Sequence, residues 1–211
     1  MKLCVASLVV VCLSLAAAPA FADYSNGPIN GSVDAWTINF GYVVSNTFTC
    51  CGLDPIYRFS FGVWEYPGDT LTQVDWSITS AENGGTVYGQ GTATSNGGTG
   101  GVLYEQFISS NQYGYNIDEA TVDGLRVNAV NGTLWLNLQN ASVASGDPVY
   151  WDENSGPSSA SQSAVGTIPS EAFTIYDHET TTVTTPEPSS ILLFGSGLVG
   201  VAGILRRKLG R

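Results

Sequence analysis

The chain has 211 residues, 12% of them charged and 43% hydrophobic, and its formal net charge is −11 at pH 7. Of the eighteen acidic residues only Glu187 lies outside Asp23 to Thr185, where Arg58 and Arg126 are the only basic residues, so this body carries 2 − 17 = −15. Such an acidic surface argues against nucleic acid or an anionic membrane surface as a partner and favours solubility outside the cell.

The first 22 residues predict a secretory signal peptide that begins as an apolar helix. Lys2 precedes the apolar run 3–18, and the small residues Ala20 and Ala22 suit signal peptidase after passage through the general secretory translocon. A lipoprotein signal at Cys12 is the competing interpretation, but the three valines before it are too bulky. We therefore expect cleavage before Asp23.

Removal of that segment leaves one adjacent cysteine pair, Cys50 and Cys51. A disulfide usually separates its Cα atoms by about 5.5 Å, whereas neighbouring Cα atoms lie about 3.8 Å apart. A strained vicinal disulfide, an intermolecular bridge and two free thiols all stay open. An oxidising exported compartment favours an oxidised form.

The body, residues 23–176, has the length of one domain and alternates apolar and polar residues in short runs. These runs predict strands with the following residues on a common face: Trp36, Ile38 and Phe40; Tyr57, Phe59, Phe61 and Val63; Val74, Trp76 and Ile78; Leu134, Leu136 and Leu138; Phe173 and Ile175. Turn formers separate them, including a glycine-rich stretch at 95–101 that predicts a long hairpin loop. The pattern favours an antiparallel β-sandwich, jelly-roll-like in its strand order.

Four aromatic residues beside predicted turns are candidates for exposed carbohydrate contacts. They are Trp64 and Tyr66 near "EYPGD", and Tyr150 and Trp151 in "VYWDENSG". Flat aromatic faces stack on sugar rings, although rings in strands usually fill a core.

Acidic residues offer two further interpretations. Hard oxygen ligands gather in "NIDEATVDG" and "YWDENSG", so Asp118, Glu119, Asp123, Asp152 and Glu153 are candidate calcium ligands, although neither stretch has EF-hand spacing. No other cofactor is expected. Paired carboxylates for glycoside hydrolysis could also come together, with Glu65, Asp69, Asp75, Glu105, Asp152 and Glu153 as the available set. The single histidine, His178, lies in a flexible stretch, which disfavours a Ser-His-Asp triad.

The chain then becomes threonine-rich over 177–185, which predicts a linker. Residues 186–211 begin with Pro186, Glu187 and Pro188, which impose an extended backbone, and continue into an apolar segment that predicts a transmembrane helix over 189–205. The tail 206–211 is basic, and its charges lie on Arg206, Arg207, Lys208 and Arg211, which the positive-inside tendency places in the cytoplasm as a stop-transfer signal.

The Pro-Glu-Pro motif, the following serines, the Gly-Ser-Gly-Leu core and the basic end together resemble the PEP-CTERM sorting signal, although Thr185 stands where valine is common. The resemblance implies export from a Gram-negative bacterium that makes exopolysaccharide, and transient anchoring in the inner membrane. It also implies recognition of Pro186, Glu187 and Pro188 by an exosortase, which would pass the protein to the cell surface or the extracellular matrix.

We therefore expect a noncatalytic, exosortase-sorted surface or matrix protein that associates with exopolysaccharide in a biofilm. A secreted hydrolase that cleaves polysaccharide with paired carboxylates is the alternative.

Overall fold

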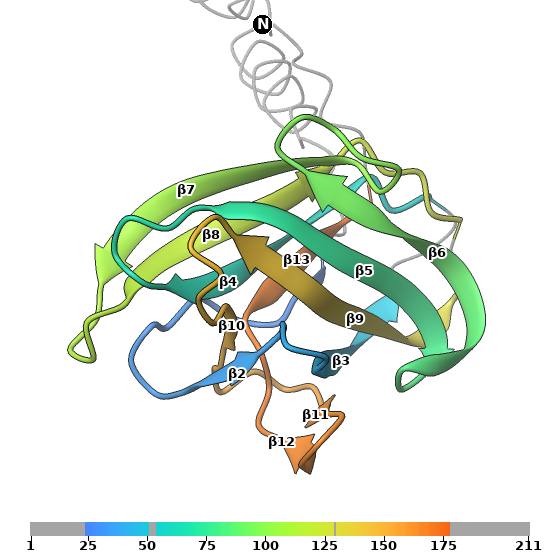
Figure 1. The fold of residues 1–211 in the computed structure, drawn as a ribbon. Coiled ribbons are helices and arrows are strands. Elements are labelled where there is room, and N and C mark those ends of the chain that lie inside the picture. The colour runs from blue at the N-terminus through green and yellow to red at the C-terminus, as the bar shows by residue number, and fades with distance from the viewer. Residues whose placement is uncertain (1–23, 51–53, 129, 178–211) are drawn as a thin grey trace, which may run out of the picture. The chain divides into compact units, whose positions relative to one another are not determined.

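The computed structural model describes residues 24–50, 54–128 and 130–177, and these residues form an all-β body (Figure 1). Its strands are β1 (Tyr24–Ser25), β2 (Ala35–Thr37), β3 (Val43–Cys50), β4 (Arg58–Glu65), β5 (Leu71–Ala81), β6 (Gly84–Thr94), β7 (Val102–Ser110), β8 (Asn116–Asp123), β9 (Gly132–Val143), β10 (Tyr150–Asp152), β11 (Ala160–Gln162), β12 (Gly166–Ile168) and β13 (Phe173–Tyr176). The predicted all-β class is thereby confirmed.

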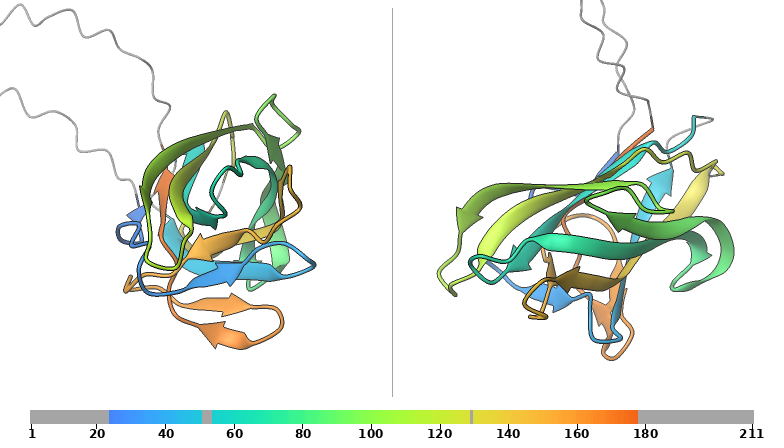
Figure 2. Two further views of the ribbon diagram at one scale, coloured as in Figure 1. Left: turned by 60° about the vertical axis from the view of Figure 1, so that its left-hand side comes forward. Right: turned by 45° about the horizontal axis from the view of Figure 1, so that its top comes forward.

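The two separate layers of a sandwich are not confirmed, because hydrogen bonds join the strands into one mixed sheet. Its order is β1-β13-β4-β8-β7-β6-β5-β9-β3-β11-β12, and β10 pairs with both β2 and β4. The pairings are antiparallel except between β6 and β7, which meet in parallel at Thr94 and Val102. The sheet curls into a half-barrel (Figure 2), and register shifts in β5 and β7 contribute to the bending.

The core lies between the two halves of the curled sheet. Phe59 of β4 meets Trp76 of β5 with ring centroids 5.9 Å apart, and Phe48 of β3 meets Phe173 of β13 at 6.3 Å. The alternating residues predicted in β5, β9 and β13 are buried, as expected. Alternation therefore identified the buried face correctly, but the surface that covers it is the other half of the same sheet.

One predicted strand is shorter than expected. Trp36 lies in β2, which ends at Thr37, and Phe40 stands in a turn with a positive φ of 56° and 64% of its surface exposed. Phe40 therefore does not share the buried face with Ile38, and this part of the alternating pattern was misleading.

The glycine-rich stretch is also not a hairpin loop, because it connects two strands that run parallel. Its residues lie against β6, where a Cβ built on Gly91 would come within 2.3 Å of the Gly100 Cα atom. Trp76 of β5 holds the loop in place by donating its indole N–H to the Gly100 carbonyl at 2.8 Å. Glycine is required here because two backbones touch directly.

Several predictions fall outside the described residues. These are the signal peptide at 1–22, the 189–205 helix, the sorting motif and basic tail, Cys51 and the side chain of Cys50, and the 177–185 linker except for Asp177. Among the residues that are described, no helix has the length and apolar character needed to cross a membrane.

Candidate functional site: an aromatic cluster and a buried carboxylate cluster

Five aromatic rings gather where β4, β8 and β10 come together, and we call them the aromatic cluster: Trp64, Tyr66, Tyr113, Tyr115 and Tyr150. Trp64 is stacked on Tyr113 with centroids 6.0 Å apart and planes inclined by 21°. Tyr115 touches three neighbours, with centroid distances of 5.8 Å to Trp64, 4.9 Å to Tyr66 and 5.6 Å to Tyr150. The hydrogen bond between the Tyr66 and Tyr115 hydroxyl groups, and then the charge of Tyr115, raise the pKa of Tyr66 above its usual value.

Three of the four predicted carbohydrate residues belong to this cluster, but their exposure differs from expectation. Tyr66 is 41% exposed and Tyr150 is half-buried, whereas Trp64 is only 4% exposed. Trp151 is fully buried, donates to the Ala172 carbonyl at 2.9 Å and packs against core phenylalanines. Exposure was therefore wrongly predicted for both tryptophans, since β10 lies inside the fold although its sequence resembles a turn.

Sequence reasoning missed Tyr113 and Tyr115, which lie in the connection between β7 and β8. Tyr113 has 56% of its surface exposed, more than any other ring of the cluster. The segment "NQYGY" carried a usable signal, because two tyrosines stand among turn-forming residues. Their approach to Trp64 could not be seen without the β4–β8 register, which places Trp64 opposite Ile117.

Asp152 positions the buried floor of the aromatic cluster. Its carboxylate accepts hydrogen bonds from the Trp64 indole N–H at 2.6 Å and from the backbone N–H groups of Asn30 at 2.6 Å and Gly31 at 2.8 Å. The carboxylate can approach β4 closely because residue 62 is glycine; a Cβ there would lie 2.8 Å from the Asp152 Cβ. Asp152 therefore ties the segment before β2 to β4.

A second feature lies on the inward face of the curled sheet and is called here the carboxylate cluster: Glu65, Glu105 and Asp118. One carboxylate oxygen from each lies within 4.8 Å of the others. Glu65 ends β4, and Asp118 of β8 pairs with Val63 and Phe107 on the two flanking strands. Directly opposed residues on neighbouring strands face the same way, so the register brings the three side chains together.

The electrostatics of this cluster are dominated by burial and by like charge. Burial first, and then the charges of Glu105, Asp118 and Asp69, raise the pKa of Glu65 to about 9. Burial raises the pKa of Glu105 to about 7 although the Leu71 N–H donates to it at 3.0 Å, and burial raises the pKa of Asp118 as well. Glu65 and Glu105 can hydrogen-bond to each other only when one of them carries a proton.

The predicted calcium ligands do not meet in either of the groupings that their sequence order suggested. Asp118 joins the carboxylate cluster, Glu119 lies on the opposite face of β8, and Asp123 caps the Gly124 N–H at 2.7 Å. Asp152 is engaged by its three donors, and Glu153 accepts from the Trp36 indole at 3.0 Å. Alternation along a strand sends neighbouring acids to opposite faces, which explains the separation of Asp118 from Glu119.

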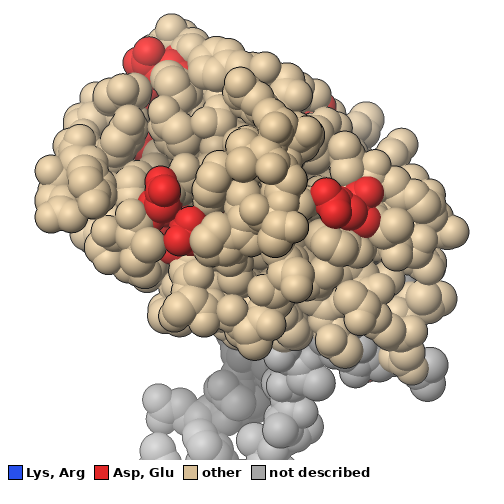
Figure 3. Space-filling model, turned by 90° about the horizontal axis from the view of Figure 1, so that it is seen from below, with Lys and Arg blue, Asp and Glu red and all other residues tan. Residues whose placement is uncertain are grey.

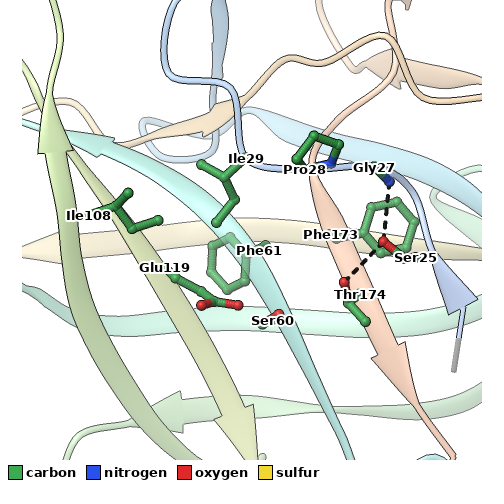
Figure 4. A pocket seen from close by; sticks show the side chains of 10 residues that line it. All are labelled: Ser25, Gly27, Pro28, Ile29, Ser60, Phe61, Ile108, Glu119, Phe173 and Thr174. Carbon is green, nitrogen blue, oxygen red and sulfur yellow. Dashed lines mark hydrogen bonds between the residues drawn. The ribbon is translucent and has the colours of Figure 1, made fainter.

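Glu119 borders a pocket of about 300 Å³ between the N-terminal segment and strands β4, β7, β8 and β13 (Figure 4). Ile29, Ile108 and Phe61 supply apolar walls, and Ser60 lies beside the Glu119 carboxylate. With one charged group and a largely apolar lining, the pocket brings no second carboxylate toward Glu119. None of the residues that line this pocket belongs to the aromatic cluster or to the carboxylate cluster.

A further acidic residue is buried just before β13, where the chain pairs with the residue that follows β10. Glu171 is 0% exposed, its two carboxylate oxygens have no hydrogen-bond partner, and an isolated antiparallel bridge places it opposite Glu153. Burial raises the pKa of Glu171 well above its usual range, and the charges of Glu153, Asp152 and Asp34 raise it further. Glu171 is therefore protonated in the folded protein over a wider pH range than in the unfolded chain.

This difference predicts a pH-dependent effect of Glu171→Gln. Above the ordinary glutamate pKa of 4.5 the folded state binds more protons than the unfolded state, so the free energy of unfolding falls as pH rises toward the folded pKa. The wild type loses at most about 1.4 kcal/mol of its free energy of unfolding per pH unit in this way. Glutamine does not titrate, so the variant escapes this loss. The difference in melting temperature, variant minus wild type, should therefore increase by at least about 3 °C between pH 5 and pH 8.

Thermal unfolding at the two pH values measures this difference. Glu119→Gln, which removes a carboxylate from the border of the Figure 4 pocket, is the matched control and should show no such trend. An equal offset of Glu171→Gln at both pH values would show that Glu171 is not held protonated.

The charged side chains of the body are mostly acidic. The face drawn in Figure 3 displays separate acidic groups and no basic side chain among the coloured residues. Arg58, one of two basic residues in the body, lies over the Tyr176 ring at 4.0 Å from its centroid. A molecule that approaches this body therefore meets a negatively charged protein.

The described residues form an acidic β body with partly exposed aromatic rings and a buried group of three carboxylates. The C-terminal segment is more informative: residues 184–208 match the PEP-CTERM protein-sorting motif. A comparison with curated proteins found no match. The chain therefore carries a PEP-CTERM sorting domain, which marks it as an exported protein that is sorted by an exosortase.

Proposed function

We propose that this protein is a noncatalytic component of the cell surface or extracellular matrix that binds exopolysaccharide through the aromatic cluster. The observation that carries the proposal is the grouping of Tyr66, Tyr113, Tyr115 and Tyr150 around Trp64, with two tyrosines broadly exposed. Rigid amphipathic rings offer contact area at low entropic cost, and their hydroxyl groups can bond to sugar hydroxyls.

The sorting tail supports the location of this binding. We place the 189–205 helix in the inner membrane of a Gram-negative host during sorting, with Arg206, Arg207, Lys208 and Arg211 on the cytoplasmic side. The acidic domain would then face the periplasm until the exosortase acts near Pro186. The net charge of −15 between Asp23 and Thr185 favours a neutral or amino-sugar polymer over one rich in uronic acids.

If the aromatic cluster binds exopolysaccharide, Tyr113→Ala should weaken that binding. Removal of the most exposed ring should raise the dissociation constant for neutral exopolysaccharide from the native bacterium about fivefold to tenfold, which corresponds to about 1–1.4 kcal/mol. Affinity electrophoresis or calorimetry with the purified polymer measures the change.

Tyr104→Ala is the matched control, because Tyr104 on β7 is also 56% exposed but lies outside the cluster. It should bind as the wild type does. Equal weakening by both variants, or by neither, would contradict a specific role of the aromatic cluster.

The hydrolase alternative rests on the close approach of Glu65 and Glu105, a carboxyl pair with raised pKa values of about 9 and about 7. The burial of Glu65 supports the noncatalytic proposal, because this side chain is 1% exposed and Glu105 beside it is half-buried, which leaves little access for a sugar ring. Release of reducing ends from the host polymer, abolished by Glu65→Gln or Glu105→Gln, would instead establish hydrolysis.

A further inference from the structure

The carboxylate cluster concentrates three acidic side chains where the fold provides little to neutralise them. Glu65, Glu105 and Asp118 come from three adjacent strands and face the interior of the curl, where Val63 and Ala120 are fully buried. Like charges at this separation repel one another strongly in a medium of low polarity. An arrangement of this kind needs protons or a cation.

Hydrogen bonds from the surrounding protein do not compensate the buried carboxylates of this cluster. Glu65 is only 1% exposed, yet neither of its carboxylate oxygens accepts a hydrogen bond. Oε1 of Glu105 has no hydrogen-bond partner either. Buried polar atoms are nearly always paired, and an unpaired carboxylate is among the most costly exceptions. These unpaired oxygens belong to Glu65 and Glu105, two of the three side chains whose carboxylates converge, so they indicate a cation site and not merely an acidic surface.

We propose that Glu65, Glu105 and Asp118 form a calcium-binding site that joins β4, β7 and β8. Calcium prefers carboxylate oxygens at 2.3–2.6 Å, so ligands on opposite sides of the ion are about 5 Å apart. The three carboxylate oxygens, all within 4.8 Å of one another, fit inside that sphere. Each carboxylate brings one oxygen to this point, so three of the six to eight ligand positions would come from the cluster and water would complete the shell.

The position of the cluster gives a bound ion a structural role. Glu105 is half-buried, and the backbone N–H of Leu71 donates to its second oxygen. Glu65 directly precedes Tyr66, and Asp118 follows Tyr115 by three residues. Bound calcium would therefore hold together the two strand ends that carry the aromatic cluster, although the site stands on its own observations and does not depend on carbohydrate binding.

Thermal unfolding and calorimetry of the exported chain purified from its host test the proposal. Addition of 10 mM Ca²⁺ to protein stripped with EDTA should raise the melting temperature by roughly 3–10 °C, as expected for an extracellular site with a dissociation constant of roughly 0.1–1 mM. Calorimetry should count one such ion per chain. Magnesium, which demands tighter octahedral geometry, should stabilise less.

Two variants make the result specific to this site. Glu65→Gln and Glu105→Gln should each abolish the calcium response while remaining folded, and in EDTA Glu65→Gln should melt no lower than the wild type because glutamine fills the same volume and its amide can donate to Glu105. Glu119→Gln removes one charge from the opposite face of β8 and should keep the full response. Retention of the wild-type response in both cluster variants, or no response of the wild type, would overturn the proposal.

Discussion

Replacing Asp152 with alanine is expected to lower the free energy of unfolding by about 3–5 kcal/mol. The substitution leaves the Trp64 indole N–H and the backbone N–H groups of Asn30 and Gly31 without their acceptor in a place where Asp152 is fully buried. Each stranded buried donor costs about 1–3 kcal/mol, and the three losses overlap because they share one carboxylate. Few other single substitutions in this domain should cost as much.

Denaturant unfolding measures this effect, with the dependence of the free energy of unfolding on denaturant concentration taken as equal for all variants. Asp152→Asn retains one acceptor oxygen and should fall between the wild type and alanine. Glu82→Ala, at an exposed position in the turn between β5 and β6, should change stability by less than about 0.5 kcal/mol. A loss below about 1 kcal/mol for Asp152→Ala would mean that water or a rearranged loop replaces the carboxylate.

The second large effect concerns the destination of the protein. Simultaneous Pro186→Ala, Glu187→Ala and Pro188→Ala should stop processing, so that the chain keeps its C-terminal segment and stays with the membrane fraction. The motif match at 184–208 includes all three positions, and the two prolines preset an extended backbone that suits a peptidase cleft. Intact mass and cell fractionation in the native host report both consequences together.

The natural protein should lose the mass of the segment beyond its cleavage point and reach the surface or the medium. A control with Thr180→Ala, Thr181→Ala and Thr182→Ala changes three residues just before the matched segment and should be processed normally. If the Pro-Glu-Pro variant and the natural protein fractionate alike and both retain the segment, the tail serves only as an anchor.

The aromatic cluster shows where sequence reasoning reached its limit. Trp64, Tyr66 and Tyr150 were predicted to contact carbohydrate, and the structure places them together, yet Trp64 forms the buried floor and Tyr113 offers the most exposed ring. Position next to a turn indicates that a side chain can be exposed. Whether it is exposed depends on which segment covers it, and Trp151 is covered by Phe61 and Phe173 from strands distant in sequence.

The carboxylate cluster shows the same limit more strongly. Glu65 and Glu105 stood among six carboxylates proposed for hydrolysis, and Asp118 stood among the calcium ligands, so each residue was noticed but no grouping joined the three. They are 40 and 13 residues apart along the chain, and only the β4–β8 and β8–β7 registers bring them together. A shift of one residue in either register would turn one of these acids to the other face.

What the sequence determined by itself was local or linear: the β class, the buried face of most strands, the acidity of the body and the Pro-Glu-Pro sorting signal, which is read as a continuous stretch of chain. The tertiary structure alone decided that one sheet curls over its own core, that five rings gather in one cluster, and that three carboxylates meet. The reason is physical, because alternation and composition act between neighbours in sequence, whereas strand order, register and burial depend on contacts between segments that the chain brings together only when it folds.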